Sequence, residues 1–171
     1  IYERYLTFTQ LADSERTEKS KRKLRGIFYT PEPIVDYLLS NTIDELLKSG
    51  RAPSSIKILD PACGSGSFLI NAFDRIVRAR NLSQDSNLLD FLDTASQNIF
   101  GIDIDEQATE IAKLNILLRC LKSDAQLPDL SGNIVSANTL LSPSMSAIMG
   151  GFGDTAIEDT PFSLDRNFPE V

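Results

Sequence analysis

Histidine is absent from this 171-residue sequence, and cysteine occurs only twice. Without histidine there is no Ser-His-Asp or Cys-His nucleophile and no histidine general base. Cys63 and Cys120 are far apart in the sequence, which argues against a zinc site and against a disulfide framework. The groups that remain for chemistry are backbone amides, carboxylates, side-chain amides and a bound cofactor, and no metal site is predicted.

Long apolar runs are also missing. No apolar stretch reaches the roughly 18 residues that a membrane-spanning helix requires, so no membrane association is expected. The hydrophobic content of 42% and the charged content of 24% are ordinary for a soluble globular protein. The length suits one domain with its own core, and the few cysteines favour a reducing cytoplasm.

Basic residues are distributed unevenly along a chain whose formal net charge is −7. Residues 1–25 carry seven Lys and Arg against four acidic residues, and the rest of the chain carries ten against twenty. An acidic body of this kind argues against a large DNA-binding face. The basic stretch 16–25 is better explained as a solvated loop, with a contact to phosphate as the alternative.

The stretch from Ile56 to Ile70 has the order of a strand, a tight loop and a helix start. Residues 54–59 predict a short strand, and residues 67–80 predict a helix with one apolar face. Gly64 and Gly66 lie between them and lack the Cβ atoms that would keep a ligand away from the backbone. Backbone N–H groups and the positive end of the helix dipole would face that ligand. A nucleotide-like cofactor is the first hypothesis, and a generic turn is the alternative.

Strands and helices alternate along most of the chain. The sequence predicts helices over 2–11, 31–49 and 88–95 and after Asp105, and strands over 98–103 and 133–137, with Thr30 and Asp105 as N-caps. Such alternation is typical of parallel βαβ units, whose ligand crevice lies at the carboxyl ends of the strands. The sequence therefore predicts an α/β fold.

Asp60-Pro61-Ala62-Cys63-Gly64-Ser65-Gly66-Ser67-Phe68 resembles motif I, the S-adenosylmethionine-binding loop of N6-adenine DNA methyltransferases. The loop departs from the dinucleotide fingerprint Gly-x-Gly-x-x-Gly, because Leu69 holds the third glycine position. The resemblance implies that Asp60, Ala62, Cys63, Gly64, Ser65 and Gly66 contact the cofactor. Asp60 would favour the ammonium group of the cofactor, and the loop N–H groups would favour its carboxylate.

Gly26-Ile27-Phe28-Tyr29-Thr30-Pro31 resembles motif X of the same family, which precedes motif I. By this resemblance, Tyr29 and Thr30 lie against the methionine end of the cofactor. Taken alone, the Thr-Pro pair would be explained as a plain helix cap. Its position before motif I favours the cofactor-binding interpretation.

Phe100-Gly101-Ile102-Asp103-Ile104-Asp105 resembles motif II. A carboxylate at the end of the second strand can accept hydrogen bonds from both ribose hydroxyls, and the resemblance gives this role to Asp103. Ile104 is expected to pack beside the adenine ring. Asp105 is more simply a helix cap.

Residues 132–141 resemble motif III, in which Asn138 takes the position of an Asp or Asn. There its side chain would hydrogen-bond the adenine edge of the cofactor. A polar residue that merely ends a strand is nearly as good an explanation for Asn138 alone. The four matches together, in the order of the family, predict S-adenosylmethionine as the cofactor.

The resemblance implies a Rossmann-like S-adenosylmethionine-dependent methyltransferase fold. It predicts a helix and basic lead-in loop over 1–25, the cofactor-binding half over 26–141, and a loop over 142–171. Motif IV of the family, Asn/Asp-Pro-Pro-Tyr/Phe, is not present in the 171 residues. A fold truncated before its fourth strand is therefore expected.

The function expected from these matches is the cofactor-binding portion of a site-specific adenine-N6 DNA methyltransferase of a restriction–modification system, inactive by itself. DNA would be bound mostly by parts not present here. Methylation of RNA or of a protein glutamine, and a non-catalytic cofactor-binding assembly module, are the alternatives. If the first strand lacks a neighbour, either self-association through its exposed edge or cover by the C-terminal tail is expected.

Overall fold

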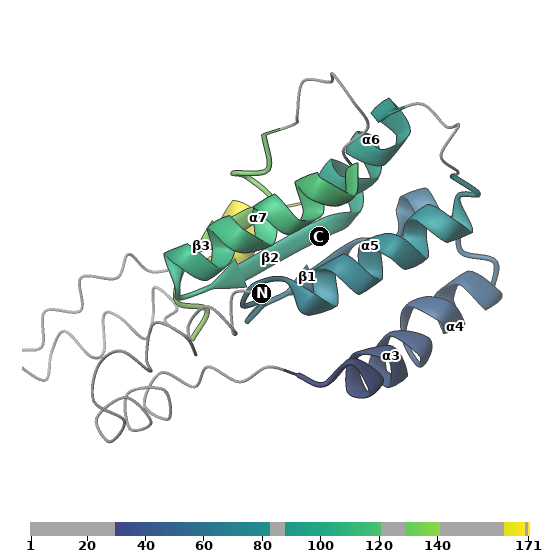
Figure 1. The fold of residues 1–171 in the computed structure, drawn as a ribbon, viewed down its shortest axis with the longest axis horizontal. Helices are drawn as coiled ribbons and strands as arrows, with labels where there is room; N and C mark the ends of the chain where they lie inside the picture. Colours follow the sequence, from purple (N-terminus) through teal and green to yellow (C-terminus); the bar gives the residue numbers. More distant parts are fainter. Residues whose placement is uncertain (1–29, 83–87, 121–128, 141–162, 170) are drawn as a thin grey trace, which may run out of the picture.

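The computed structural model describes residues 30–82, 88–120, 129–140, 163–169 and 171. Three short strands form one sheet, and helices α5 and α7 run along one of its faces, with α3 and α4 beyond α5 (Figure 1). In chain order the described elements are α3 (Glu32–Ser40), α4 (Ile43–Lys48), the 3-10 helix η1 (Pro53–Ser55), β1 (Ile58–Asp60), α5 (Ser67–Ala79), α6 (Leu88–Asn98), β2 (Ile99–Asp103), α7 (Glu106–Cys120), β3 (Ile134–Ser136) and α9 (Leu164–Asn167).

The sheet is parallel, with the strand order β1-β2-β3. Ile58 of β1 pairs with Ile99 of β2, and Gly101 of β2 pairs with Ile134 of β3. This arrangement confirms the predicted α/β class and brings the carboxyl ends of the three strands to one end of the sheet. Within the described part of the chain, β1 has a neighbour on one side only.

The main core lies between the sheet and the crossover helices. The predicted apolar face of α5 is confirmed, because its buried residues are Leu69, Ala72, Phe73 and Ile76. Gly101 of β2 lies beneath this helix, where an added Cβ would be 2.7 Å from Leu69 Cδ1 and 3.0 Å from Cys63 Sγ. The side chains of Leu69 and Cys63 therefore pack directly on the backbone of β2 at this glycine, and a larger residue there would require them to shift.

The opposite face of the sheet carries a smaller apolar cluster formed by Leu59, Phe100, Ile102, Val135 and Ala137. Phe168, which follows α9, is buried in this cluster, and its ring meets that of Phe100 edge to face at 5.5 Å. Within residues 142–171, for which a loop is predicted, the described part contains the short helix α9. The described part of the tail covers a face of the sheet and not the open edge of β1.

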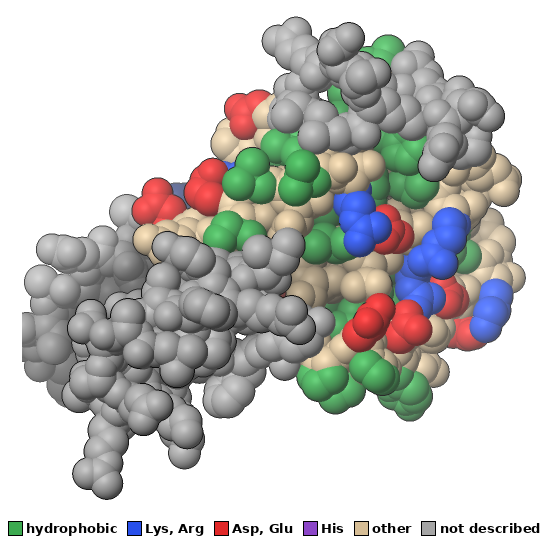
Figure 2. Space-filling view, viewed as in Figure 1, with side chains coloured by type: hydrophobic (Ala, Val, Ile, Leu, Met, Phe, Trp, Pro, Cys, Tyr) green, Lys and Arg blue, Asp and Glu red, His purple; other side chains and the backbone are tan. Residues whose placement is uncertain are grey.

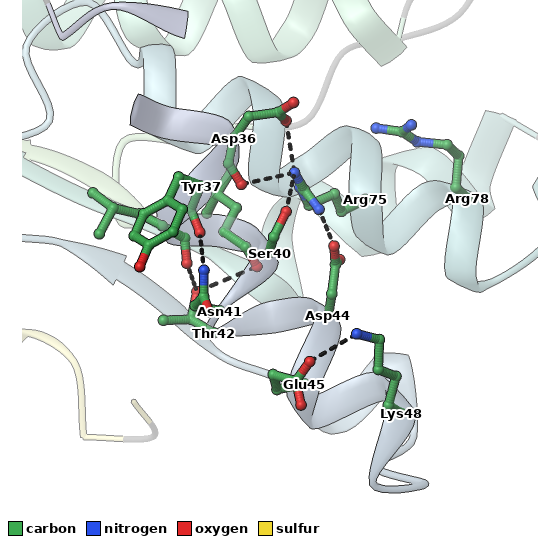
Figure 3. A network of polar contacts seen from close by, with 12 residues as sticks. Asp36, Tyr37, Ser40, Asn41, Thr42, Asp44, Glu45, Lys48, Arg75 and Arg78 are labelled. Carbon is green, nitrogen blue, oxygen red and sulfur yellow. Dashed lines mark hydrogen bonds and ion pairs between the residues drawn. The ribbon is translucent and has the colours of Figure 1, made fainter. Parts of the chain in front are cut away.

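The single helix predicted over 31–49 is two helices, α3 and α4, separated at Asn41 and Thr42. Asn41 Nδ2 donates to the Tyr37 carbonyl at 2.7 Å, and Thr42 Oγ1 donates to the Leu38 carbonyl at 2.8 Å (Figure 3). The Tyr37 carbonyl also keeps its helical bond from the Asn41 N–H at 3.1 Å, but the Leu38 carbonyl accepts the Thr42 hydroxyl while the Thr42 N–H turns to the Leu39 carbonyl at 3.4 Å, which favours a break.

The start of α3 also differs from the prediction. Pro31, and not Thr30, is the N-cap residue, and no side chain caps the helix. The strand predicted over 54–59 is likewise shorter, because Pro53–Ser55 forms η1 and the strand begins at Ile58. The buried side chain of Asn98 fixes this bend, since its Nδ2 donates to the Pro53 and Ile56 carbonyls at 3.0 and 2.7 Å.

Helix α7 is confirmed, with Asp105 as its cap. Asp105 Oδ1 accepts hydrogen bonds from the N–H groups of Gln107 and Ala108 at 3.0 and 3.4 Å. The helix packs mostly small side chains inward, and Leu114 and Leu118 are 57% and 62% exposed. Small inward side chains let the backbone of α7 approach its neighbours closely.

Among the described residues, none of the helices has the length and apolar character needed to cross a membrane. The helix predicted over 2–11, the basic stretch 16–25 and Tyr29 lie outside the described residues.

Candidate cofactor site

The loop after β1 is attached to the end of β2 by backbone hydrogen bonds. Cys63 N donates to the Ile102 carbonyl at 2.8 Å, and Gly64 N donates to Asp103 Oδ2 at 2.8 Å. Thr139 Oγ1, beyond β3, donates to the Pro61 carbonyl at 3.3 Å. The segments that follow all three strands therefore meet at one place, as the α/β topology predicts.

The carboxylate of Asp103 is held from both sides. Its Oδ2 accepts the Gly64 N–H, and its Oδ1 accepts the Asp105 N–H at 2.9 Å. Each carboxylate oxygen has two lone pairs, so one acceptor position on each oxygen remains for a ligand. This arrangement fixes the orientation of the carboxylate.

Asp60 ends β1, and its Oδ1 accepts the Ala62 N–H at 3.0 Å. Burial raises the pKa of this carboxyl group, and the charge of Asp103 raises it further, although the Ala62 hydrogen bond acts in the opposite direction. Neither Asp60 nor Asp103 forms an ion pair with Lys or Arg in the described ranges. Two carboxylates that have no basic partner among the described residues favour a cationic ligand.

The glycine loop supplies the complementary charge. Gly64 and Gly66 have φ values of +53° and +88°, and Gly66 is the N-cap residue of α5 without a side-chain cap. The first N–H groups of α5 therefore have no capping side chain, and the positive end of the helix dipole lies at the loop. An anionic group of a ligand fits here, close to the carboxylates that favour its cationic part.

The cysteine of the loop does not present its thiol to a ligand. Cys63 is buried, and burial raises the pKa of its thiol to about 12, with the charges of Asp60 and Asp103 adding to the effect. Ser65 and Gly66 are buried, Gly64 is partly buried, and Ala62 is exposed. The loop can therefore contact a cofactor mainly through its backbone.

Ile104 and Asn138 follow β2 and β3 at the end of the sheet where this loop lies. Ile104 is 61% exposed next to Asp103, which leaves its side chain available to a flat ring. The side-chain carbonyl of Asn138 accepts the Leu140 N–H at 3.1 Å, so its amide donor is the group left for a ligand. Thr30 is partly buried just before α3, a helix that lies alongside α5.

One residue of the site was missed in the sequence. Asn115 of α7 donates from Nδ2 to the Ser65 carbonyl of the glycine loop at 3.0 Å. An asparagine within an otherwise apolar helical pattern is the only signal that the sequence offered, and it does not indicate a partner 50 residues away.

Among the described residues, no group of three His, Cys, Asp or Glu side chains is arranged to hold a metal ion. A family model described as N-6 DNA Methylase matches residues 11–168. The chain belongs to this family. The methyl donor of N6 DNA methyltransferases is S-adenosylmethionine. This cofactor combines a sulfonium, an ammonium, a carboxylate and two ribose hydroxyls, and the carboxylates and helix N–H groups of the site fit these groups.

Several curated relatives are similar to this chain. A type II restriction enzyme and methyltransferase of Heyndrickxia coagulans is 32% identical over 143 residues, covering 83% of this chain and 19% of the relative. A type II restriction enzyme and methyltransferase of Escherichia coli is 28% identical over 173 residues, covering 82% and 17%. A type I restriction enzyme methylase subunit of Methanocaldococcus jannaschii is 31% identical over 107 residues, covering 63% and 16%. The chain thus spans less than a fifth of each of these relatives.

A solved structure supports the fold. The nuclease-deletion mutant of the Type ISP restriction-modification enzyme LlaGI, solved in complex with a DNA substrate mimic, matches with a TM-score of 0.51 at 20% identity. The match covers 72% of this chain and 11% of that chain. The strand–loop–helix order that motif I predicted therefore belongs to a fold shared with a restriction–modification enzyme.

Proposed function

We propose that this chain holds S-adenosylmethionine for the N6-adenine methylation of DNA in a restriction–modification system. The observation that carries the proposal is the pairing of two carboxylates, Asp60 and Asp103, with the uncapped start of α5 across one glycine loop. A ligand with cationic groups and a single carboxylate complements both halves of this site. A dinucleotide would bring two further phosphate charges next to two carboxylates.

The geometry suggests a role for each residue. Asp103 accepts hydrogen bonds from the ribose hydroxyls, and Asp60 favours the ammonium group. The N–H groups of the first turn of α5 favour the cofactor carboxylate, because those of Ala62, Cys63, Gly64 and Gly66 already donate within the protein. Exposed Ile104 packs on the adenine ring, and the amide of Asn138 donates to its edge. Tyr29 and Thr30 are proposed to lie at the methionine end, as their resemblance to motif X implies.

We further propose that the chain binds the cofactor without transferring its methyl group. The bound cofactor supplies an electrophilic methyl group, but the exocyclic nitrogen of adenine is a weak nucleophile because its lone pair is delocalised into the ring. In the family, an Asn/Asp-Pro-Pro-Tyr/Phe motif polarises this nitrogen and stacks on the flipped base. The 171 residues contain no such motif.

Isothermal titration with S-adenosylmethionine tests the cofactor site. The unchanged chain should bind, and Asp103→Ala should weaken binding by at least about tenfold, because hydrogen bonds to a charged group are among the stronger ones. Asp129→Ala is the matched control, since Asp129 also accepts a backbone N–H, that of Ser131, but is exposed and remote from the loop. Equal affinities for the unchanged chain and Asp103→Ala would contradict the proposal.

A methyl-transfer assay tests the second part. With radiolabelled cofactor and adenine-containing duplex DNA, the purified chain should incorporate no label above background. Turnover by the chain alone would contradict the proposal. As a positive control, a separately produced polypeptide that carries the Asn-Pro-Pro-Tyr motif of a relative is added, and label should then be incorporated.

In the part of the chain that the structure describes, β1 is paired on one side only, and its other edge suggests self-association with a second copy. A groove of about 390 Å³ runs along this edge, between β1 and the α3–α4 pair, and is lined by apolar residues that include Leu38, Leu46 and Phe68. Unpaired strand edges flanked by apolar surface pair readily with other chains. Two buried free thiols also suit a reducing compartment, so we place the protein in the cytoplasm.

Light scattering across a concentration series tests this association. The average mass should rise with concentration, and Leu46→Lys within the groove should suppress the rise. Leu118→Lys is the control, because Leu118 is exposed on α7, which lies on the far side of α5. A constant monomer mass at high concentration would contradict self-association.

A further inference from the structure

We propose that Asn115 of α7 is a positioning residue that holds the glycine loop in the conformation that receives the methionine part of the cofactor. The inference rests on the proposed cofactor site and adds to it a residue that touches the loop but need not touch the ligand. It begins from the hydrogen bond that Asn115 Nδ2 donates to the Ser65 carbonyl at 3.0 Å.

The peptide unit between Ser65 and Gly66 is held at both of its polar ends. Its carbonyl accepts the hydrogen bond from Asn115, and its N–H, which belongs to Gly66, donates to the Cys63 carbonyl at 2.9 Å. A peptide unit is planar, so two bonds at opposite ends fix its orientation. Without Asn115, the Ser65 carbonyl would lose the partner that α7 provides.

The loop touches α7 at a second point close by. Gly66 lies so near this helix that an added Cβ would be 3.0 Å from Ala112 Cβ. Ala112 is fully buried and lies three residues before Asn115, on the same side of the helix. The hydrogen bond from Asn115 and the close approach of Gly66 to Ala112 therefore hold residues 65 and 66 of the loop against one side of α7.

The orientation of this peptide unit affects the ligand-binding groups on either side of it. The Gly64 N–H, two peptide units before it, donates to Asp103 Oδ2 at 2.8 Å. The Gly66 carbonyl, immediately after, accepts the Ile70 N–H at 2.8 Å and so opens the first turn of α5. A rotated peptide would change the direction in which the first N–H groups of α5 point, and with it the position of the cofactor carboxylate.

The effect should depend on which part of the ligand is bound. S-adenosylhomocysteine has both the nucleoside and the amino-acid part, whereas 5′-methylthioadenosine has the nucleoside part only. Because the first N–H groups of α5 are proposed to bind the amino-acid carboxylate, Asn115→Ala should weaken the binding of S-adenosylhomocysteine about three- to tenfold, the effect of one lost hydrogen bond. Its affinity for 5′-methylthioadenosine should change by less than about twofold.

Asn71→Ala is the matched control. Asn71 is a partly buried asparagine of α5, and its Nδ2 donates to the Ser67 carbonyl at 2.9 Å within the same helix. The control therefore removes a similar hydrogen bond near the same loop without releasing the loop from α7. It should leave both ligand affinities unchanged within about twofold.

The test is titration calorimetry of the full chain with both ligands. It is performed well below the melting temperature of each variant. A selective loss of S-adenosylhomocysteine affinity in Asn115→Ala supports the inference. Equal losses for both ligands, or no loss in a chain whose unchanged form binds, overturn it and leave the proposed function standing. If the unchanged chain binds neither ligand, the proposed function is wrong and this inference falls with it.

Discussion

Helix α5 is held in different ways on its flank toward α7 and on its flank toward α3 and α4. Toward α7 the contact is made by small groups near the start of α5, where the backbone of Gly66 meets Ala112. Toward α3 and α4 the contact is made by charges in the middle of α5, where Arg75 reaches across to both helices (Figure 3). Figure 2 shows basic and acidic side chains side by side over this flank of the molecule.

Arg75 bridges the break between α3 and α4. Its guanidinium binds the Asp44 carboxylate on α4, the Asp36 carboxylate on α3 at 2.7 Å, and Ser40 Oγ at the end of α3 at 3.4 Å. The Arg75 side chain is only 13% exposed, so it needs these partners more than a surface arginine would. The flank toward α3 and α4 therefore combines this ion-pair cluster with the buried apolar side chains of Val35, Leu39 and Ile43, whereas the flank toward α7 has the close approach at Gly66.

The substitution Gly66→Ala, which breaks the contact between the loop and α7, should have the largest effect on the free energy of unfolding. The left-handed φ and the close approach to Ala112 together should lower the free energy of unfolding by about 2–4 kcal/mol in urea denaturation. Gly50→Ala is the control, because Gly50 has φ +86° and nothing within 4 Å of an added Cβ. It should cost only about 1 kcal/mol. Equal losses at the two positions would show that the contact with α7 is unimportant.

Arg75→Met should have the next largest effect. It removes the cation but keeps the length of the side chain, leaving Asp44 partly buried without its partner, and should cost about 1–2 kcal/mol of unfolding free energy in the same assay. Arg78→Met is the control, because Arg78 is exposed on α5 and binds only a carbonyl of its own helix among the described contacts. A neutral Arg75→Met would mean that apolar packing alone places α3 and α4.

Arg119→Met tests whether charge also matters on the α7 side. Arg119 pairs with Asp74 of α5 at 2.7 Å, but its side chain is 53% exposed. Exposed pairs contribute little, so the loss of unfolding free energy should be below about 1 kcal/mol and should vanish in high salt. A loss as large as that of Arg75→Met would remove the difference between the two flanks.

The rate of thiol labelling is expected to show the smallest effect, but it reports on the surroundings of one cysteine at a time. Cys63 and Cys120 are both buried, and burial raises the pKa of each thiol to about 12, so labelling at pH 8 requires local opening. Gly66→Ala should speed the labelling of Cys63, identified by mass spectrometry, more than that of Cys120. Arg75→Met should leave the Cys63 rate near that of the unchanged chain. A similar increase at Cys63 in both variants would indicate that the flanks act together.

Several local features could be predicted from the sequence. The apolar face of α5, the cap of α7 by Asp105, and the loop between β1 and α5 follow from side-chain periodicity and short-range hydrogen bonds. The break between α3 and α4 was missed because the apolar spacing continues across Asn41 and Thr42. Their hydrogen bonds to preceding carbonyls override that spacing.

The sequence by itself determined the order of strand, glycine loop and helix, the acidic residues at the ends of two strands, and the family to which they point. These are local properties, set within a few residues by backbone sterics and side-chain chemistry. Only the tertiary structure decided that Asn115 binds Ser65 and that Arg75 binds Asp36, across 50 and 39 residues. Such contacts depend on how the crossover helices pack over the sheet, because only that packing brings distant residues within hydrogen-bonding distance.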